Sequence, residues 1–548
     1  MKLTRIVLLL LILMHGYAYC QTLEAEIDKI YKVKENAPGY SIAVFKSDQI
    51  IFEKQYGIAN MDYDIPITQK TLFDVGSVAK QFTAYAILLL EERGQLSIKD
   101  PAYQYIDQLP RYLKGDPTIE QLLNQTSGIS EVDGIAGIAD LGMNDLLTQS
   151  RMMNFIVKAR TLNFSPGAYF QYTNSNYILL ADIIAKVSGK SFANFMMEDV
   201  FEPFDMKNTI KKTSTYSIIK NRAIGYVEDE GDFYKTHLHA YVYNGDGQVL
   251  TTARDMFKWH VGLKRLESKS SALYKKMHTQ AKLNNGNVID YGLGVEYETH
   301  NGYKAYGFDG MILGGFVSKY LYFPELDIAF FTTQNTFNED FDEQFFQLVD
   351  LYITKNSSKN DPTNKERIKE VTLSKDDLKS YEGDYLFMGS DVESSKMNTI
   401  QLRGDRLSVL TADGDEITKL KPIGNHQFLF NDKIVEFDLA LDSKSYKYYD
   451  SENELPWLFT AFKPYDYKTN QLKELEGQYF NADYQISKKV KLKDGKLYVF
   501  SKNGSRQDEI EPISEDVFDY SSDPIEFIRN ENQEIIGLEI MKIVFEKI

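Results

Sequence analysis

Cysteine is nearly absent from this sequence. Among 548 residues there is one, Cys20, and a lone cysteine near the N-terminus forms no disulfide within the chain. Disulfide-stabilised folds and thiol catalysis are therefore excluded. The fold has to be held by packed apolar side chains, which a chain of this length with 43% apolar residues can provide.

Basic residues are outnumbered by acidic ones. The chain has 62 lysines and arginines against 79 aspartates and glutamates, which gives a formal charge of -17. A general nucleic-acid binder normally carries a basic face, and attraction to anionic lipid needs one as well. We therefore expect no nucleic-acid partner, and we expect most of the charge to lie on solvated surface.

The apolar run at the N-terminus is short. Nine residues, Ile6–Met14, follow two basic residues and precede a polar stretch with small residues. This is the layout of a secretory signal, and nine residues are too few to span a bilayer. We predict a signal peptide over residues 1–20, export to the periplasm or the medium, and no transmembrane span after its removal. Tyr19 before Cys20 makes a poor lipoprotein box, so a lipid anchor is disfavoured.

Histidine is also rare, with 7 in the chain. His237 and His239 have the spacing of two ligands on a strand, but no third ligand follows them. His300 is expected to have a structural role. We therefore expect no metal and no cofactor.

One stretch places a hydroxyl and an amine three residues apart where a long apolar run begins. Ser77 and Lys80 precede the run from Phe82 to Leu90, which predicts a buried helix that Gly94 can end. Residues three apart share a helix face, with Cβ atoms about 5 to 6 Å apart. A serine needs a base, and a lysine in desolvated surroundings can act as one. We therefore predict Ser77 as the nucleophile and Lys80 as its partner.

The Ser-x-x-Lys pattern is weak by itself. It occurs a second time, at Ser217 and Lys220. Only the context of the first copy distinguishes it, because a helix N-terminus directs backbone N–H groups at any oxyanion formed there.

A tyrosine and an asparagine two residues apart form a second group. Tyr172 and Asn174 follow a Pro-Gly turn and precede an expected helix over residues 177–187. The residues alone favour a packed tyrosine and a helix N-cap. The functional alternative gives Tyr172 a proton transfer, and it gives Asn174 hydrogen bonds to the substrate and to Lys80.

The pattern of strands and helices predicts an α/β (α+β) domain with an antiparallel sheet flanked by helices and a helical subdomain. A polar turn separates two expected strands near the N-terminus, and further strands follow after residue 290. The expected strands cover residues 40–45, 50–57, 291–297, 303–311, 315–323 and 327–334, and the expected helices include 118–128 and 341–352.

The chain then changes character. Residues 357–372 are polar and are expected to link two parts of the protein. Beyond them, the segment 381–385 recurs 94 positions later, and further matches recur at a spacing of 90. Each copy contains short alternating strands, which predicts two small antiparallel barrel-like domains, over 373–464 and 465–548. No chemistry is recognised in either.

Residues 21–356 resemble the serine β-lactamase and penicillin-binding superfamily, in the branch of class C β-lactamases, D-alanyl-D-alanine carboxypeptidases, D-aminopeptidases and esterases. The resemblance rests on four motifs that occur in family order. They are Leu72–Lys80, Leu122–Gly128, Phe164–Asn174 and Glu202–Thr209. The C-terminal part is similar in architecture to D-aminopeptidases with two barrel domains.

The resemblance implies a mechanism. Ser77 attacks a carbonyl, Lys80 and Tyr172 share the proton transfers, and Asn174 holds the site together. The backbone N–H groups of Ser77 and Met311 form the oxyanion hole. A small-molecule or peptide substrate is cleaved through an acyl-enzyme without a cofactor.

The sequence departs from the family at the third motif. Where relatives have Lys-Thr-Gly or His-x-Gly, it has Phe308, Asp309 and Gly310, so the basic residue that binds a substrate carboxylate is missing. Asp309 is expected to repel a carboxylate or to attract an amine. The leading hypothesis is an exported hydrolase of an amide or ester. The alternative is a catalytically impaired binding or sensor protein, motivated by Phe308 and by Gln125, where relatives often have histidine.

Overall fold

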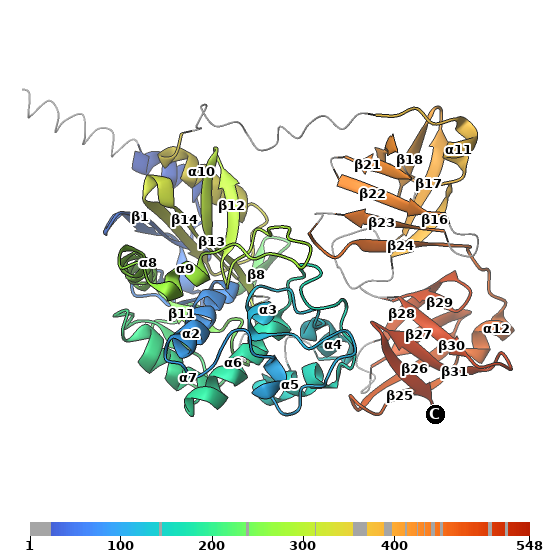
Figure 1. Cartoon of the computed structure of the whole chain (residues 1–548), viewed down its shortest axis with the longest axis horizontal. Coiled ribbons are helices and arrows are strands. Elements are labelled where there is room, and N and C mark those ends of the chain that lie inside the picture. The colour runs from blue at the N-terminus through green and yellow to red at the C-terminus, as the bar shows by residue number, and fades with distance from the viewer. Residues whose placement is uncertain are drawn as a thin grey trace, which may run out of the picture. The chain divides into compact units, whose positions relative to one another are not determined.

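A computed structural model describes most of the chain (Figure 1). The predicted signal peptide with Cys20, the His237/His239 pair and most of the predicted linker lie outside the described residues. The described residues are 23–141, 145–236, 241–312, 314–354, 370–387, 397–411, 414–424, 426–431, 433–439, 444–449, 453–501, 507–520 and 524–548.

A six-stranded antiparallel sheet forms the centre of the N-terminal part, in the order β12-β13-β14-β15-β1-β2. Its first and last strands in sequence are neighbours, because Tyr40 of β1 pairs with Gln334 of β15. The predicted N-terminal hairpin is confirmed as β1 and β2. The strand bounds are β1 Tyr40–Lys46, β2 Gln49–Gln55, β12 Glu296–His300, β13 Tyr303–Ile312, β14 Phe316–Phe323 and β15 Ile328–Gln334.

The predicted strand over 291–297 is wrong for most of its length. Strand β12 starts only at Glu296. The residues before it form a turn in which the Gly292 N–H donates to the Val295 carbonyl over 2.7 Å. Gly294 has a φ of +73°, a conformation that favours glycine. The two glycines that looked like part of a strand pattern therefore make a turn.

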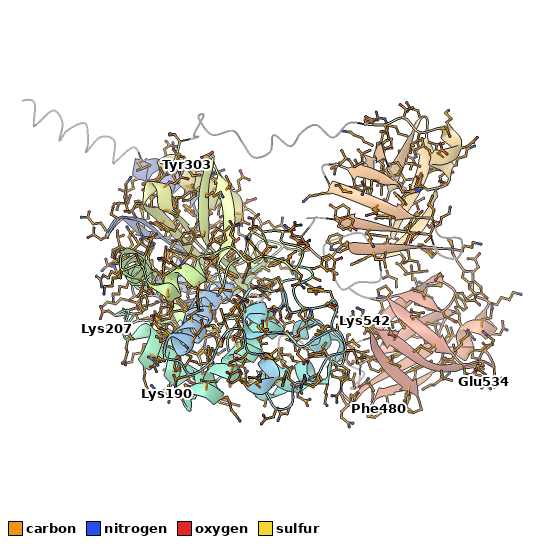
Figure 2. All side chains as sticks on the ribbon, in the orientation of Figure 1. Lys190, Lys207, Tyr303, Phe480, Glu534 and Lys542 are labelled. Atoms are coloured by element: carbon orange, nitrogen blue, oxygen red, sulfur yellow. The ribbon has the colours of Figure 1, made fainter. Side chains whose placement is uncertain are left out.

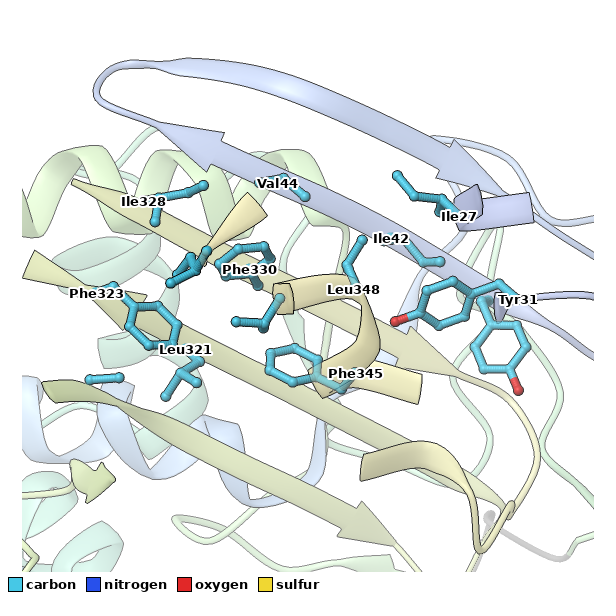
Figure 3. Close-up of a cluster of buried hydrophobic side chains, with 14 of the residues drawn as sticks. Ile27, Tyr31, Ile42, Val44, Leu321, Phe323, Ile328, Phe330, Phe345 and Leu348 are labelled. Atoms are coloured by element: carbon cyan, nitrogen blue, oxygen red, sulfur yellow. The ribbon is translucent and has the colours of Figure 1, made fainter. Parts of the chain in front are cut away.

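One face of the sheet packs against α10 (Phe341–Tyr352) and the helix within residues 23–30. Alternate residues of each strand point to this face, since the side-chain period of a strand is two. Figure 3 shows this core, with Phe345 and Leu348 of α10 lying over the strands. The strand residues in the core include Ile42, Val44, Leu321, Phe323, Ile328 and Phe330.

An aromatic layer on the other face holds β13 and β14. The ring of His278 lies 4.1 Å from the ring of Tyr274 and 4.6 Å from that of Tyr306. His260 on α8 (Ala253–Ser268) places Nδ1 2.8 Å from the hydroxyl of Tyr320. Burial lowers the pKa of both histidines to about 4, so they are neutral parts of the core.

This layer predicts a loss of stability in acid. The pKa of His278 is about 4 in the folded protein and about 6.5 in the unfolded chain, so between these pH values only the unfolded chain binds the proton. The stabilisation that comes from this pKa difference is fully present above about pH 6.5. It is lost as the pH falls to about 4, so the free energy of unfolding decreases across this interval. We expect His278→Asn to reduce the slope by about 1.4 kcal/mol per pH unit. Denaturant unfolding at several pH values measures this, and identical slopes for the two proteins would contradict the lowered pKa.

The N-terminal part also contains the helices that carry Ser77, Lys80 and Asn174. The serine motif forms a short 3₁₀ turn, η1 (Gly76–Ala79), which continues into α2 (Lys80–Glu92). Almost every residue of α2 is buried, as its apolar surface on all sides predicted. Other α-helices among the described residues are α3 Ile119–Leu123, α4 Val132–Ile138, α5 Gln149–Lys158, α6 Asn174–Ser188, α7 Phe192–Phe195 and α9 Ala272–Met277.

Small sheets complete this part. Strands β5 (Phe73–Asp74), β11 (Val249–Thr251) and β7 (Ile210–Lys211) form one of them, with β11 in the middle. The others are two-stranded. They pair β3 Ile58–Asn60 with β4 Ile65–Pro66, β6 Leu147–Thr148 with β10 Tyr241–Val242, and β8 Tyr226–Asp229 with β9 Asp232–Lys235.

The C-terminal part contains two antiparallel sheets, which confirms the predicted fold class. The first has nine strands, and the second is a closed barrel of eight. A short helix precedes each, α11 (Lys375–Lys379) and α12 (Thr469–Glu474). In chain order, the strands of the first sheet are β16 Gly383–Phe387, β17 Met397–Arg403, β18 Arg406–Leu410, β19 Glu416–Lys419, β20 Lys421–Gly424, β21 Gln427–Phe430, β22 Lys433–Asp438, β23 Ser445–Tyr449 and β24 Trp457–Phe462. Within the sheet they lie in the order β19-β18-β17-β16-β24-β23-β22-β21-β20. The barrel runs from β25 Gly477–Asn481 through β26 Ile486–Lys493, β27 Lys496–Phe500, β28 Gln507–Ser514, β29 Val517–Asp519, β30 Ile525–Arg529 and β31 Ile535–Ile540 to β32 Ile543–Lys547.

The two sheets repeat individual contacts. In the first, the buried Tyr385 hydroxyl donates to the Tyr381 carbonyl over 2.8 Å, and in the second the buried Tyr479 hydroxyl donates to the Leu475 carbonyl over 2.7 Å. A glutamate of each copy also accepts from a backbone N–H. These contacts are Leu402 N–H to Glu382 and Leu492 N–H to Glu476. The sequence repeat is therefore a structural repeat.

The chain divides into two compact units that do not follow the order of the sequence. The first holds the residues up to Ser127, Met143–Met153 and Asn174–Asp361. The second holds Gly128–Gly142, Asn154–Thr173 and Pro362–Ile548. Two segments between the serine motif and α6 thus belong with the C-terminal sheets.

Much of the charge is on the surface. Lys207, whose side chain is 78% exposed, and Glu534 are among the outward-pointing side chains labelled in Figure 2. Among the described residues, no helix has both the length and the apolar composition needed to cross a membrane.

Candidate active site

The first unit brings Ser77, Lys80 and Asn174 together. The Lys80 amine donates to the Ser77 hydroxyl over 2.8 Å and to the Asn174 side-chain carbonyl over 2.8 Å. Lys80 is fully buried, and its Nζ lies 5.5 Å from the centre of the Tyr177 ring. Three of the four residues predicted to carry the chemistry therefore meet around one amine.

A third oxygen near this amine was not predicted. The backbone carbonyl of Asp246 accepts from Lys80 over 3.2 Å. The loop that carries this carbonyl is held by α2 and α6. Thr83 of α2 donates to the Gly245 carbonyl over 2.7 Å. Gly245 also packs so closely against α6 that a Cβ on it would lie 1.9 Å from the Tyr177 carbonyl. A backbone acceptor leaves no signature in the sequence, because any residue can supply it.

The serine turn lies against β13 with no room for side chains between them. A Cβ on Gly76 would lie 2.9 Å from Met311 N, and one on Gly310 would lie 3.1 Å from Ser77 N and 2.1 Å from the Val75 carbonyl. Strand β12 pairs with β13 only as far as Gly307, so the edge of β13 beyond it is open to the turn. Two glycines thus bring the backbones of Ser77 and Met311 close, as an oxyanion hole requires.

In the third motif, an uncharged phenylalanine lies on the face of the sheet that packs against α8, on the same side as its cross-strand neighbour Tyr320. Phe308 is 3% exposed and its ring packs edge-on against Tyr291 at 5.9 Å. Asp309 points to the opposite face, where it accepts from its cross-strand neighbour Lys319 over 3.0 Å. The nitrogen of Lys319 lies 4.8 Å from the ring centre of Phe346 on α10. The structure therefore separates Asp309 from Phe308 and Gly310, as strand alternation requires.

Gln125 is part of a buried polar network. It has a φ of +61° and accepts from the Asn176 amide over 2.6 Å. The Ser127 hydroxyl donates to the side-chain carbonyl of Asn176 over 2.7 Å. This network attaches the loop after α3 to α6, the helix that starts at Asn174.

Charged groups that sequence reasoning missed lie beneath the serine turn. The Asp74 carboxylate accepts from the Gly76 N–H over 3.2 Å. Lys211 donates to the Tyr243 carbonyl over 2.9 Å, and burial lowers the pKa of Lys211 and of Lys212 to about 8. Burial raises the pKa of Asp74, against the attraction of these lysines. The residues are scattered in sequence, and no motif connects them.

Tyr172 belongs to the second unit. It lies in residues 171–173, which have no regular secondary structure, two residues before Asn174. Its predicted place beside Ser77 stays a prediction. The second Ser-x-x-Lys pattern does not resemble the first, because Ser217 and Lys220 are exposed and lie outside any helix. Within the described part of the chain, no cluster of three metal-ligating side chains is found.

A lysine buried between a serine and an asparagine, beside an antiparallel sheet, is the arrangement of penicillin-binding serine hydrolases. A model of the family described as Beta-lactamase matches residues 21–351. Because this match covers more than half of the chain, the chain belongs to the Beta-lactamase family.

Curated relatives are similar over the same region. The D-aminopeptidase of Brucella ovis is 26% identical over 296 residues, which are 54% of this chain and 55% of that protein. Penicillin-binding protein 4* of Bacillus subtilis is 30% identical over 271 residues, which are 46% of this chain and 58% of that protein. The chain thus spans about half the length of the curated relatives it matches.

Solved structures share the fold. The octameric penicillin-binding protein homologue from Pyrococcus abyssi covers 89% of this chain and 98% of its own, with a TM-score of 0.53 and 22% identity. D-amino acid amidase from Ochrobactrum anthropi, in complex with L-phenylalanine amide, covers 60% of this chain and 98% of its own, with a TM-score of 0.51 and 21% identity.

The close approach of the serine turn to β13 gives a prediction. Gly310→Ala would place a methyl group 2.1 Å from the Val75 carbonyl, so the turn and the strand must separate. A displacement of about 1 Å is expected to slow reaction at Ser77 about 100-fold, measured as the rate of labelling by a fluorophosphonate. Gly137→Ala, where the added methyl group meets open space, is the matched control. A folded Gly310→Ala protein that labels at the wild-type rate would contradict the contact.

Proposed function

We propose that this chain is an exported serine hydrolase that cleaves an amide or ester through an acyl-enzyme on Ser77. One observation carries the proposal: the buried Lys80 amine lies 2.8 Å from the Ser77 hydroxyl. A hydroxyl is a weak nucleophile near neutral pH, and a base within hydrogen-bond reach is what it needs.

The contacts of Lys80 are compatible with both its charged and its neutral form, and the neutral form is the one that can act as a base. A neutral amine has two N–H groups and one lone pair. The Asn174 side-chain carbonyl and the Asp246 backbone carbonyl are acceptors only, so they use the two N–H groups. Of these three oxygens only that of Ser77 carries a proton. In the proposed neutral state, Ser77 would therefore donate to the lone pair of Lys80.

The proposed reaction starts from that state. The Ser77 oxygen attacks the substrate carbonyl while its proton passes to Lys80, and the oxyanion is held by the N–H groups of Ser77 and Met311. The bond to the leaving amine or alcohol breaks as that group receives a proton, with Tyr172 sharing the transfer. Water then attacks the acyl-enzyme by the reverse sequence and releases the acid.

The third motif supports a substrate without a carboxylate near the bond that is cleaved. Where relatives have a cation, Phe308 is a buried apolar side chain without a charge. Asp309 is paired with Lys319 on the other face, so it is not proposed to attract an amine. We propose amides and short esters that lack a carboxylate near the cleaved bond, including D-amino-acid amides, which the names of the D-aminopeptidase and the D-amino acid amidase suggest.

Active-site labelling tests the nucleophile. A fluorophosphonate is expected to label the wild-type protein, and Ser77→Ala is expected to abolish labelling and to lower hydrolysis by about 10³-fold or more. Ser217→Ala removes the serine of the exposed second pattern and is expected to behave as wild type. Equal labelling of wild type and Ser77→Ala would reject the proposal and leave a binding or sensor protein.

A substrate panel tests the specificity. D-amino-acid amides and short esters are expected to be hydrolysed with higher kcat/KM than a chromogenic cephalosporin, whose carboxylate finds no cation at residue 308. Phe308→Lys supplies that cation and is expected to narrow the gap. A wild-type preference for the cephalosporin would contradict the proposed substrate class.

A further inference from the structure

Two hydrogen bonds join residues 170–173, here called the Tyr172 segment, to residues 453–455, which lie just before β24 of the first C-terminal sheet. The Phe170 N–H donates to the Asn453 carbonyl over 2.9 Å, and the Leu455 N–H donates to the Phe170 carbonyl over 3.3 Å. Phe170 thus forms a parallel bridge with Glu454. Leu455 lies two residues before β24, so the pairing is anchored in a regular sheet.

The closed barrel holds the neighbouring helix α4. Lys488 points into the barrel with no exposed side-chain surface, and its amine pairs with the Asp140 carboxylate over 2.6 Å. A Cβ on Gly134 of α4 would lie 2.6 Å from Cε of Met541, at the end of the barrel. Breaking a buried ion pair is costly, since it leaves an uncompensated charge. This attachment is therefore not a loose surface contact.

The barrel also holds the helix that leads into the Tyr172 segment. The ring of Phe155 on α5 lies 6.0 Å from that of Tyr484, and the amine of Lys158 donates to the Asp483 carbonyl. The segment is thus attached before Tyr172 as well as at Phe170. All these contacts lie within the second compact unit.

Chain geometry transmits the pairing to Tyr172. Tyr172 is two residues from Phe170 and two from Asn174, and two residues span at most about 7 Å. No helix or strand holds residues 171–173 between these points. The backbone of Tyr172 is therefore restrained from two directions, by the start of α6 and by the pairing of Phe170.

We propose that the segment Asn453–Leu455 is a positioning element of the active site, which fixes the place of Tyr172 by pairing with Phe170. The proposal rests on the proposed function, in which Tyr172 shares the proton transfers. It gives the first C-terminal sheet a role in the reaction although it contributes no catalytic residue.

Leu455→Pro tests the pairing in the full chain. Proline has no N–H, so the variant loses the bond to Phe170, while the matched Leu455→Ala loses the same side chain and keeps the bond. We expect Leu455→Pro to lower kcat about 10-fold relative to Leu455→Ala, with a smaller change in KM. Phe170→Pro against Phe170→Ala removes the other hydrogen bond and gives the same comparison if Leu455→Pro does not fold.

A double-mutant cycle separates positioning from general damage. If the pairing acts through Tyr172, Leu455→Pro has no further effect on kcat in a Tyr172→Phe background. Full additivity would overturn the proposal, as would wild-type kcat in both proline variants.

These outcomes are distinct from failure of the proposed function. If Ser77→Ala keeps full activity, the hydrolase itself is rejected. If Ser77→Ala is inactive and Tyr172→Phe has wild-type kcat, the role of Tyr172 is rejected, and the positioning proposal with it. If both variants are impaired and the proline variants match their alanine controls, the positioning proposal alone is rejected.

Discussion

The buried amine of Lys80 is the constraint on which the rest of the site depends. An ammonium or amine removed from water must have its hydrogen bonds replaced, and the loss is several kcal/mol if they are not. The replacements come from three separate places in the chain: Ser77, Asn174 and the carbonyl of Asp246. The positive φ of Gly245 directs the chain so that the next carbonyl, that of Asp246, reaches Lys80. The hydrogen bonds of Gln125 and Ser127 to Asn176 hold the first turn of α6, which carries Asn174.

The sequence predicted the parts of the site that depend on local spacing. Ser77 and Lys80 follow from an i, i+3 relation before an apolar helix. For Asn174, the first residue of α6, the residues alone favoured a helix cap, and the bond to Lys80 was the functional alternative. Asp246 was missed, because any residue can supply a backbone carbonyl. Strand β12 was placed too early because glycine alternating with apolar residues looks like a strand. In the 291–295 turn, however, Gly294 has a positive φ, and a Cβ on Gly292 would lie 2.7 Å from the Met277 carbonyl.

The third motif shows what register adds to a motif. In the sequence Phe308 and Asp309 are neighbours, and both appeared to face the substrate. Neighbouring residues of a strand face opposite sides of the sheet. Phe308 therefore lies on the face that packs against α8, and Asp309 lies on the other face, where it pairs with Lys319. Under the proposed function, the missing cation disfavours substrates with a carboxylate at this place, and Asp309, which pairs with Lys319 on the other face, is not proposed to replace it.

The pairing of β1 with β15 has a consequence for synthesis. β1 is made early and can pair with β2 as soon as both are made, but its other edge waits for a strand that ends at Gln334. Until then an apolar strand, Tyr-Ser-Ile-Ala-Val-Phe-Lys, has an open edge, which is a template for wrong pairing between chains. During this interval β1 has to be kept from pairing with another chain until β15 has been made.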